Sequence, residues 1–116
     1  MIAYRPAKNV SKMIPYSQDV PNREEIDQLA GSAVLEFGAN WCSICKAAQP
    51  VIVAALQSHP QLRHIKAEDA SKRPLGRSFG IKLWPTLIFL KDGTEVARVV
   101  RPTTPDLIRE ALARIS

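Results

Sequence analysis

Apolar residues along the chain gather in short runs that are typical of buried β-strands, separated by polar stretches. The runs that predict strands are 33–37, 62–67, 86–90 and 95–100. Asp92-Gly93 stands between the last two runs, and this dipeptide favours a tight hairpin turn. The last two strands are therefore expected to be antiparallel neighbours.

Helical spacing of apolar residues predicts helices between these strands. Asn22 and Glu25 form a capping-box pattern that opens a helix over 23–30, and Gly31 is its expected stop. A second short helix is expected over 74–79, because a proline opens that segment and a glycine follows it.

A wide apolar stripe predicts that the longest helix begins near Cys42 and packs on the sheet. The stripe consists of Ile44, Ala47, Ala48, Val51, Ile52, Ala55 and Leu56. Pro50 lies inside it, and because the apolar spacing continues beyond, we expect a kink and not an end of the helix. The last helix is expected to have Thr104 as its cap and Pro105 as its first residue. Its predicted buried face is Leu107, Ile108, Ala111, Leu112 and Ile115.

Strands that alternate with helices, followed by a hairpin and a final helix, predict an α/β fold. The expected architecture is a central mixed β-sheet with helices on both faces. An edge strand is expected at 13–16, because Pro15 is tolerated at the edge of a sheet. We therefore divide the chain into an N-terminal extension with this edge strand, 1–20, and one globular domain, 21–116.

Composition argues against several classes of function. The net charge is +5, but Lys and Arg are scattered and are not interleaved with aromatic residues, so no nucleic-acid partner is expected. No apolar run approaches the roughly 20 residues that span a bilayer, and the first residues lack the apolar core of a signal peptide. We therefore expect a cytoplasmic protein without a membrane partner.

Cys42 and Cys45 are the only cysteines, and they lie three residues apart where a strand runs into a helix. Such a pair on a helix has Cβ atoms roughly 5–6 Å apart, which a small adjustment brings to the spacing of about 3.8 Å in a disulfide. Free N–H groups and the positive dipole end at a helix start favour a thiolate. Cys42 is therefore the expected nucleophile, and the deeper Cys45 is expected to resolve the mixed disulfide.

Residues 41–46, Trp-Cys-Ser-Ile-Cys-Lys, resemble the active-site segment of thioredoxins. Residues 84–93 resemble the cis-proline loop of that family with its following strand and hairpin turn. The similarity runs from about Ala33 to the C-terminus, about seven-tenths of the chain. It implies a thioredoxin-like fold and a protein disulfide oxidoreductase without a cofactor. Its partners would be disulfide-containing proteins and a reductase that recycles the dithiol.

Glu36 interrupts the apolar run 33–37, and burying a carboxylate without a partner is costly. One interpretation places Glu36 on a solvated face of the strand. The resemblance implies another, because thioredoxins carry a buried aspartate six residues before the first cysteine, and that acid manages the proton of the deeper cysteine. Lys66 stands where the family has a lysine that pairs with this acid, although an exposed strand lysine is an equally good interpretation.

The resemblance also implies a substrate groove beside the cysteines. Pro85 would be cis and face the redox pair, and the exposed backbone of Trp84 would pair with a substrate strand ahead of Thr86. Trp41 is expected to cover the reactive sulfur, although either tryptophan could be an ordinary core aromatic. Arg101 stands near a family glycine, and we expect it either to bind an acidic substrate or to point to solvent.

Alternatives to an oxidoreductase stay open at this point. Ser43-Ile44 is not the Gly-Pro of reducing thioredoxins, so the direction of electron flow is not set, and the scaffold could serve as a binding or adaptor module. A structural zinc needs four ligands, which two cysteines could supply only in a dimer, and no metal is expected. His59 and His64 lack a metal-ligand spacing to the cysteines and are expected at the surface.

Overall fold

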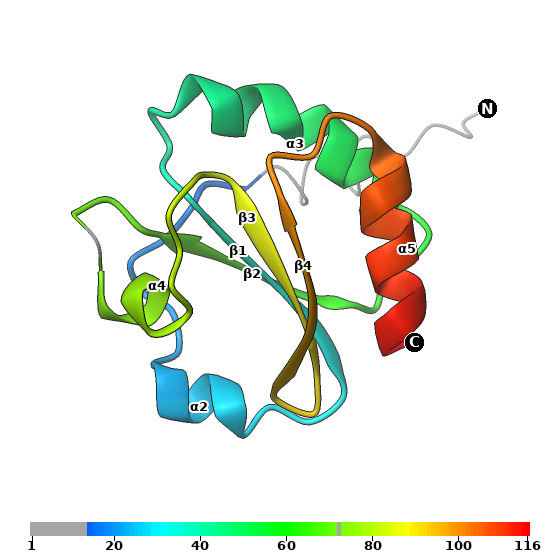
Figure 1. The fold of residues 1–116 in the computed structure, drawn as a ribbon, viewed down its shortest axis with the longest axis horizontal. Helices are drawn as coiled ribbons and strands as arrows, with labels where there is room; N and C mark the ends of the chain where they lie inside the picture. The colour runs from blue at the N-terminus through cyan, green and yellow to red at the C-terminus, as the bar shows by residue number, and fades with distance from the viewer. Residues whose placement is uncertain (1–13, 72) are drawn as a thin grey trace.

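A computed structural model describes residues 14–71 and 73–116 of the chain (Figure 1). The predicted edge strand begins at Met13, which lies outside the described residues. The elements in chain order are α2 (Arg23–Asp27), β1 (Ser32–Gly38), α3 (Ser43–Leu56), β2 (Arg63–Glu68), α4 (Pro74–Ser78), β3 (Thr86–Lys91), β4 (Thr94–Val100) and α5 (Pro105–Ile115). The division of the chain at residue 20 stays a prediction.

The four strands form one mixed sheet in the order β2-β1-β3-β4. Strand β1 pairs in parallel with β2 and antiparallel with β3, and β3 forms the predicted hairpin with β4. Strand β1 is therefore central, which explains why its residues are nearly all apolar. The predicted α/β fold with a central mixed sheet is confirmed.

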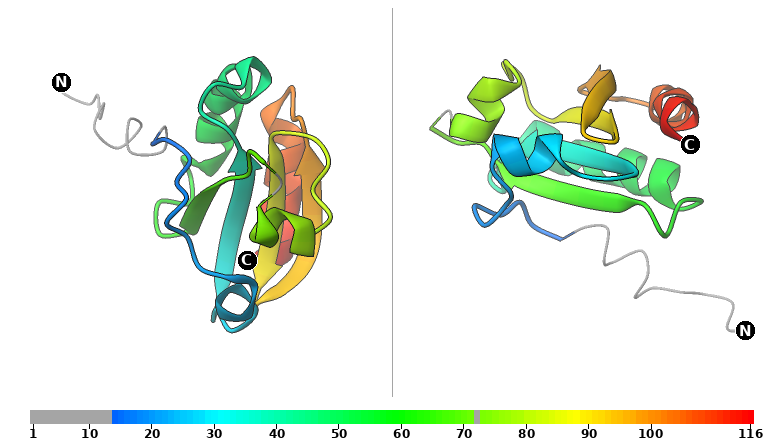
Figure 2. Two further views of the ribbon diagram at one scale, coloured as in Figure 1. Left: turned by 90° about the vertical axis from the view of Figure 1, so that its left-hand side faces the viewer. Right: turned by 90° about the horizontal axis from the view of Figure 1, so that it is seen from below.

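Each face of the sheet carries its own hydrophobic core. On one face, Val34 and Phe89 pack with the apolar sides of α3 and α5. On the other face, Leu35 and Phe37 pack with Ile26 of α2 and with the α4 region. Figure 2 gives two further views of these layers. Because side chains alternate along β1, Glu36 points to the face that α3 covers.

Two predicted elements are shorter than expected. The helix predicted over 23–30 ends at Asp27, because Gln28 leaves helical geometry and only Ile26 is buried to hold the helix on the sheet. In the described part of the strand predicted at 13–16, residues 14–16, no strand is found, and Ser17 just after it forms an isolated bridge with Ala67. Pro15 supplies no N–H group for a longer ladder.

The last helix differs from its prediction in two details. Leu107 is 54% exposed, because it lies one step outside the stripe of Ile108, Ala111, Leu112 and Ile115 that packs on the sheet. Thr104 holds the N-cap position, but its side chain makes no capping hydrogen bond. Pro105 occupies the first helical turn as predicted.

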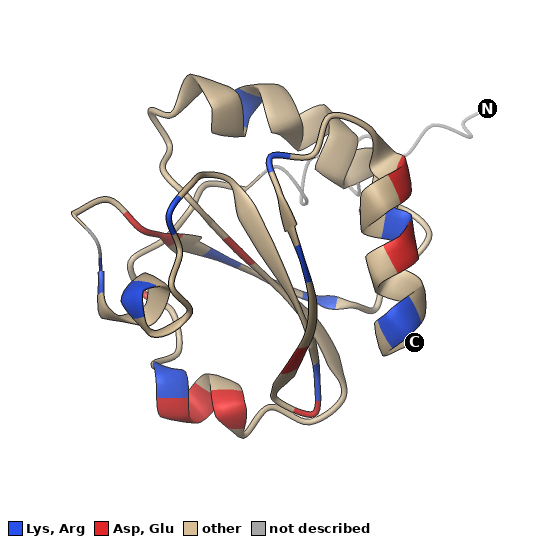
Figure 3. Cartoon of the chain, in the orientation of Figure 1, with Lys and Arg blue, Asp and Glu red and all other residues tan. Residues whose placement is uncertain are grey.

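Charged side chains are distributed over the elements of the described chain (Figure 3). Lysines and arginines lie on strands, loops and helices; acidic residues alternate with them on α5, and on α2 they follow a single arginine. Within the described residues, no helix has the length and apolar character that crossing a membrane requires.

Candidate active site

The two cysteines lie at the start of α3 with both thiols free. Cys42 is the N-cap residue, and its sulfur accepts the backbone N–H of Cys45 at 3.2 Å. Cys42 is partly exposed, whereas Cys45 is only 1% exposed. The helix therefore presents one sulfur to a partner and holds the second sulfur one turn deeper, and Pro50 lies inside the helix as expected.

The sulfur of Cys45 is enclosed by the end of β1 and by Tyr16. A Cβ atom placed on Gly38 would stand 2.8 Å from this sulfur and 2.8 Å from the Tyr16 hydroxyl, so only glycine fits at that position. Burial and the hydrogen bond to Cys42 raise the pKa of Cys45 to about 12, although a backbone contact from Ala39 opposes the rise. Cys45 is therefore a thiol at neutral pH.

Glu36 is 0% exposed, so the interpretation that places it on a solvated face is wrong. Its Oε2 accepts hydrogen bonds from the Tyr16 hydroxyl and from Gln49 Nε2, the latter at 2.9 Å. Its Oε1 lies 2.8 Å from His64 Nε2. Burial acts to raise the pKa of Glu36, but His64, the charge of Lys66 and the Tyr16 hydroxyl together hold that pKa below its usual value. Glu36 is therefore a carboxylate at neutral pH.

Lys66 is buried, so its interpretation as an exposed strand lysine is wrong. Its Nζ donates a hydrogen bond of 2.7 Å to Gln49 Oε1 and lies 4.7 Å from the centre of the Tyr16 ring. Gln49 thus bridges Lys66 and Glu36. Burial lowers the pKa of Lys66, and the negative charge of Glu36 opposes that shift.

Sequence reasoning missed three members of this buried cluster: Tyr16, Gln49 and His64. The prediction that His64 lies at the surface is wrong, because alternation along β2 places it on the same face as Lys66, which pairs in register with Glu36. Gln49 lies one helical turn after Cys45 and so shares its face. The positions of His64 and Gln49 could have been predicted from these spacings in the sequence. The position of Tyr16 depends on the bridge between its neighbour Ser17 and Ala67, which no local spacing predicts.

Two tryptophans contact each other, one directly before Cys42 in the chain and one directly before Pro85. The rings of Trp41 and Trp84 meet edge to face, with centroids 5.6 Å apart and an interplanar angle of 74°. Trp41 is 69% exposed, so it is not a core aromatic. Trp84 is partly buried, and its Nε1 donates a hydrogen bond of 2.9 Å to Asp69 Oδ2. This bond fixes the indole at the edge of the site.

The loop after Trp84 carries Pro85 and Thr86. The Trp84–Pro85 peptide bond is cis. Thr86 is buried, and its hydroxyl donates to the carbonyl oxygen of Leu83 at 2.6 Å, so it holds the loop together from within.

Arg101 lies against this loop. Its backbone N–H donates to the carbonyl oxygen of Pro85 at 2.9 Å, and its side-chain Nε donates to the carbonyl oxygen of Trp84 at 2.8 Å. Its φ of 51° lies in the left-handed region that favours glycine. Arg101 is exposed while its Nε contacts the backbone of its own chain, and the expectation that it binds an acidic substrate stays a prediction.

Asp69 supports Trp84 from inside the protein. Its carboxylate is buried, and its Oδ1 has no hydrogen-bond partner among the described residues. The same oxygen lies 1.9 Å from the point where a Cβ atom on Gly76 would stand, so Gly76 leaves room for the carboxylate. Burial raises the pKa of Asp69, and the hydrogen bond from Trp84 opposes the rise.

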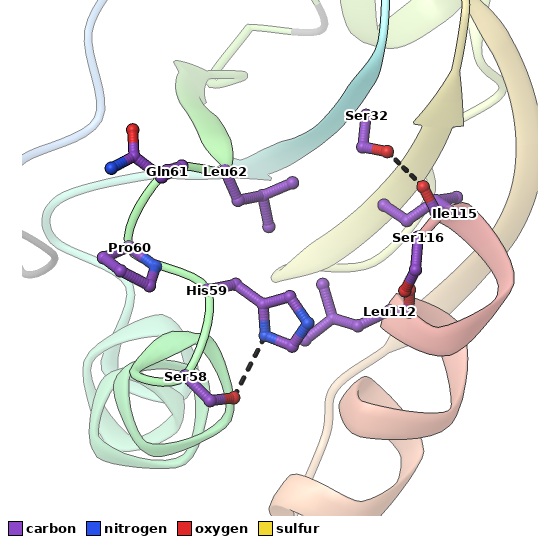
Figure 4. Close-up of a pocket in the computed structure, with 9 residues that line it drawn as sticks. All are labelled: Ser32, Ser58, His59, Pro60, Gln61, Leu62, Leu112, Ile115 and Ser116. Atoms are coloured by element: carbon purple, nitrogen blue, oxygen red, sulfur yellow. Dashed lines mark hydrogen bonds between the residues drawn. The ribbon is translucent and has the colours of Figure 1, made fainter.

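A separate pocket of about 480 Å³ lies at the opposite end of α3, beside the C-terminal end of α5 (Figure 4). His59 and Leu62 line it from the loop after α3, and Leu112 and Ile115 line it from α5. None of the cysteines or their buried neighbours borders this pocket. Among the described residues, no group of three or more His, Cys, Asp or Glu side chains is arranged to hold a metal ion.

Comparisons with known proteins agree with this geometry. The family model described as Thioredoxin matches residues 16–114. The thioredoxin of Chlamydia muridarum is 43% identical over 76 residues, which cover 64% of this chain and 74% of the relative. A thioredoxin H-type of Picea mariana is 33% identical over 91 residues, covering 78% and 72%. The reduced form of thioredoxin 2 from Pseudomonas aeruginosa PAO1 has a TM-score of 0.79 and 48% identity, covering 88% of this chain and 94% of that one.

Proposed function

The chain belongs to the thioredoxin family and is a thiol–disulfide oxidoreductase, and we propose that it works in the reducing direction on protein disulfides. The observation that carries the proposal is that the buried Cys45 thiol and the buried Glu36 carboxylate both adjoin the Tyr16 hydroxyl. When a dithiol reduces a substrate, its second cysteine must lose a proton. Cys45 holds that proton at neutral pH, and Glu36 is ionised and able to receive it.

The two sulfurs divide the reaction between them. Cys42 is the more accessible sulfur and lies at a helix N-terminus, where negative charge is stabilised, so it attacks the substrate disulfide. One substrate sulfur leaves, and a mixed disulfide joins Cys42 to the other. Cys45 then attacks Cys42, which releases the second substrate sulfur and closes the Cys42–Cys45 disulfide. A reductase partner returns the pair to the dithiol.

Glu36 and Lys66 tune the second step. The carboxylate draws the proton from the Cys45 side, and the ammonium of Lys66 limits the cost of burying that negative charge. Gln49 fixes both groups through hydrogen bonds to each. We assign Glu36 the role of proton acceptor and Lys66 the role of its electrostatic partner.

The substrate groove consists of Trp41, Trp84, Pro85 and Arg101. Trp41 offers an exposed apolar surface next to Cys42, and Trp84 borders it. The carbonyl oxygen of Trp84, which an incoming extended strand would use, already accepts a hydrogen bond from Arg101. Arg101 must therefore share or release this oxygen when a substrate docks, and this makes it a determinant of substrate choice. Thr86 supports the loop from inside.

Reduction of insulin by the protein in the presence of dithiothreitol tests the proposal. We expect turnover by the native chain, none by Cys42→Ser, and a trapped mixed disulfide with Cys45→Ser. Insulin reduction that survives Cys42→Ser would overturn the mechanism. A reducing compartment such as the cytoplasm, where thiols are kept reduced, is the location that this proposal requires.

A binding or adaptor module is the second candidate. The observation that favours it is the occupied Trp84 carbonyl beside an exposed apolar surface, since a protein partner could pack there without reaching the cysteines. This candidate predicts that a partner captured by the native chain is also captured by the double variant Cys42→Ser/Cys45→Ser. If the double variant no longer captures the partner, the adaptor function is rejected and only the redox function remains.

A further inference from the structure

The hydroxyl of Tyr16 stands between the buried thiol and the buried carboxylate. It donates a hydrogen bond to Glu36 Oε2, and its oxygen and the Cys45 sulfur are neighbours, each 2.8 Å from the point where a Cβ atom on Gly38 would stand. Tyr16 is buried, and its ring is fixed by the contact with the ammonium of Lys66. A single hydroxyl therefore joins the proton donor of the resolving step to the proton acceptor.

Glu36 reaches Cys45 through this hydroxyl. Its Oε2 is occupied by Tyr16 and Gln49, and its Oε1 is occupied by His64. In the described part of the chain these are the hydrogen bonds of the carboxylate, and the sulfur of Cys45 is not among its partners. Among the described side chains that bond to the carboxylate, Tyr16 is the one whose hydroxyl adjoins the Cys45 sulfur and can pass a proton on.

We propose that Tyr16 is the proton relay between Cys45 and Glu36 in the resolving step of the reaction. The inference rests on the proposed reducing function and names the residue that carries its proton. As the Cys45 proton passes to the oxygen of Tyr16, the hydroxyl proton of Tyr16 passes to Glu36 Oε2. The tyrosine is neutral before and after the step.

The step balances in atoms and electrons. The Cys45 sulfur bonds to the Cys42 sulfur, and the bond between Cys42 and the substrate sulfur breaks. The substrate sulfur leaves with the bonding pair and takes a proton from solvent. The dithiol has then lost two electrons, which the substrate disulfide has gained. Glu36 returns its proton to solvent.

The surroundings of Tyr16 allow it to pass a proton on but do not allow it to act as a base in the tyrosinate form. Burial and the negative charge of Glu36 raise the pKa of Tyr16 far above its usual value, so a free tyrosinate does not form. Both protons must therefore move together. The groups that face Glu36 are Tyr16 from the N-terminal segment, Gln49 from α3, and His64 and Lys66 from β2.

His64 is the member of this cluster that adjoins the edge of the sheet. Strand β2 is the edge strand of the four-stranded sheet, and the His64 side chain is 6% exposed. Its contact with Glu36 Oε1 places it on the side of the carboxylate opposite Tyr16. His64 therefore holds the second oxygen of the carboxylate in place while Oε2 faces Tyr16.

Ellman's reagent, an aromatic disulfide, separates the two steps of the reaction. In the reduced protein, attack by Cys42 releases a first coloured thiolate, and attack by Cys45 on the resulting mixed disulfide releases a second. The second phase is first order and independent of reagent concentration. We expect Tyr16→Phe, which keeps the ring and removes the hydroxyl, to slow the second phase at pH 7 by at least about tenfold and to leave the first phase unchanged.

Two further variants make the result specific. Ser32→Ala removes a hydroxyl from the other end of β1, where it donates to the carbonyl oxygen of Ile115, and it should leave both phases unchanged. Glu36→Gln removes the acceptor and should slow the second phase in the native chain but add little to Tyr16→Phe. If Glu36→Gln slows the phase and Tyr16→Phe does not, the relay is wrong while the role of Glu36 stands.

A measurement on the native chain keeps the proposal testable if Tyr16→Phe does not fold. A pocket of about 340 Å³ borders Cys45, Tyr16 and Lys66, and a water molecule there would be the alternative proton carrier. The relay moves two protons in one step, so the rate of the second phase should be a curved, quadratic function of the deuterium fraction in mixed H₂O and D₂O. Where Tyr16→Phe folds, the dependence in that variant should become linear. A linear dependence in the native chain, or a curved one that persists in Tyr16→Phe, would overturn the relay.

Discussion

The side-chain Nε of Arg101 donates a hydrogen bond of 2.8 Å to the carbonyl oxygen of Trp84. This contact joins the end of β4 to the loop that precedes β3, at the end of the sheet where β1 leads towards α3. Arg101 adopts a left-handed φ of 51° to make it, which costs a residue with a side chain about 1–2 kcal/mol. The contact therefore has a backbone cost that glycine would avoid.

The contact of Arg101 has two consequences: it occupies the Trp84 carbonyl oxygen, and it keeps a left-handed backbone at a residue with a side chain. Replacing Arg101 with glycine removes both. Arg101→Gly frees the Trp84 carbonyl and should lower KM for a neutral peptide disulfide by about two- to tenfold, the value of one hydrogen bond. Its stability should change by less than about 1 kcal/mol, because relief of the backbone offsets the lost bond. Steady-state kinetics and urea unfolding measure the two effects.

Arg101→Ala is the matched control for this prediction. It frees the same carbonyl oxygen but keeps the left-handed backbone, so it should lower KM as Arg101→Gly does and be about 1 kcal/mol less stable. An unchanged KM in both variants would show that the Trp84 carbonyl takes no part in substrate binding.

The pKa of Cys45, raised to about 12, predicts that the two thiols react very differently. Iodoacetamide at pH 7.5 should alkylate Cys42 in the native protein and leave Cys45 unmodified until urea is added, since the thiolate is the reactive form. Mass spectrometry of the digested protein reports both sites. Equal labelling of the two cysteines in the folded chain would contradict the buried environment of Cys45.

The same shift has a consequence for stability at high pH. The folded pKa of Cys45 lies above that of an unfolded thiol, near 8.5, so its contribution is complete below that value and is lost as pH rises towards 12. The reduced native chain should therefore lose stability between about pH 9 and 12. Cys45→Ala should lose less stability over this range, and the loss it keeps comes from Tyr16, whose pKa is also raised in the folded chain. If the free energy of unfolding falls equally with pH in the two proteins, the pKa of Cys45 is not raised in the folded chain.

How far the sequence predicts this site depends on how each residue is placed. Cys42, Cys45 and the hairpin are fixed by local spacing, and the sequence predicts them correctly. Tyr16 reaches the sulfur through pairing between Ser17 and Ala67, fifty positions apart, which no local pattern shows. Leu107 is apolar yet exposed, because the apolar spacing of α5 does not fix where the buried stripe ends.

The charged residues of the site are also placed by long-range pairing and not by local spacing. Lys66 and Glu36 are partners in the parallel register of β1 and β2, and that register depends on the whole sheet. Sequence spacing alone left both residues with an exposed alternative. His64 is buried beside them because it lies two residues from Lys66 on β2 and so points to the same face of the sheet. The burial of His64 therefore follows from the register of β1 and β2.

Two buried acids should give opposite pH dependences when neutralised. Burial raises the pKa of Asp69, so its contribution is complete below the unfolded value, about 3.9, and is lost as pH rises through the folded pKa. The pKa of Glu36 is lowered, so its contribution is present above about 4.3 and is lost as pH falls. Relative to the native chain, Asp69→Asn should therefore become more stable as pH rises, and Glu36→Gln less stable.

Urea unfolding of the three proteins between pH 3 and pH 7 measures both trends. The comparison is internally controlled, because each substitution replaces a carboxylate with an amide of nearly the same shape. Trends of the same sign in both variants would contradict the opposite environments of the two acids.

Loss of the Glu36 carboxylate should destabilise the protein far more than loss of an exposed acid. Glu36→Ala leaves His64 and Lys66 buried without their negative partner and removes the hydrogen bond that Gln49 Nε2 donates to the carboxylate. Breaking a buried pair in this way costs about 3–5 kcal/mol. Glu95 pairs with Arg98 at a partly exposed position, and because such pairs contribute little, Glu95→Ala should cost less than about 1 kcal/mol. Urea unfolding at pH 7 compares the two variants. Equal costs would mean that the buried cluster around Glu36 is not the interaction that holds β1, β2 and α3 together behind the cysteines.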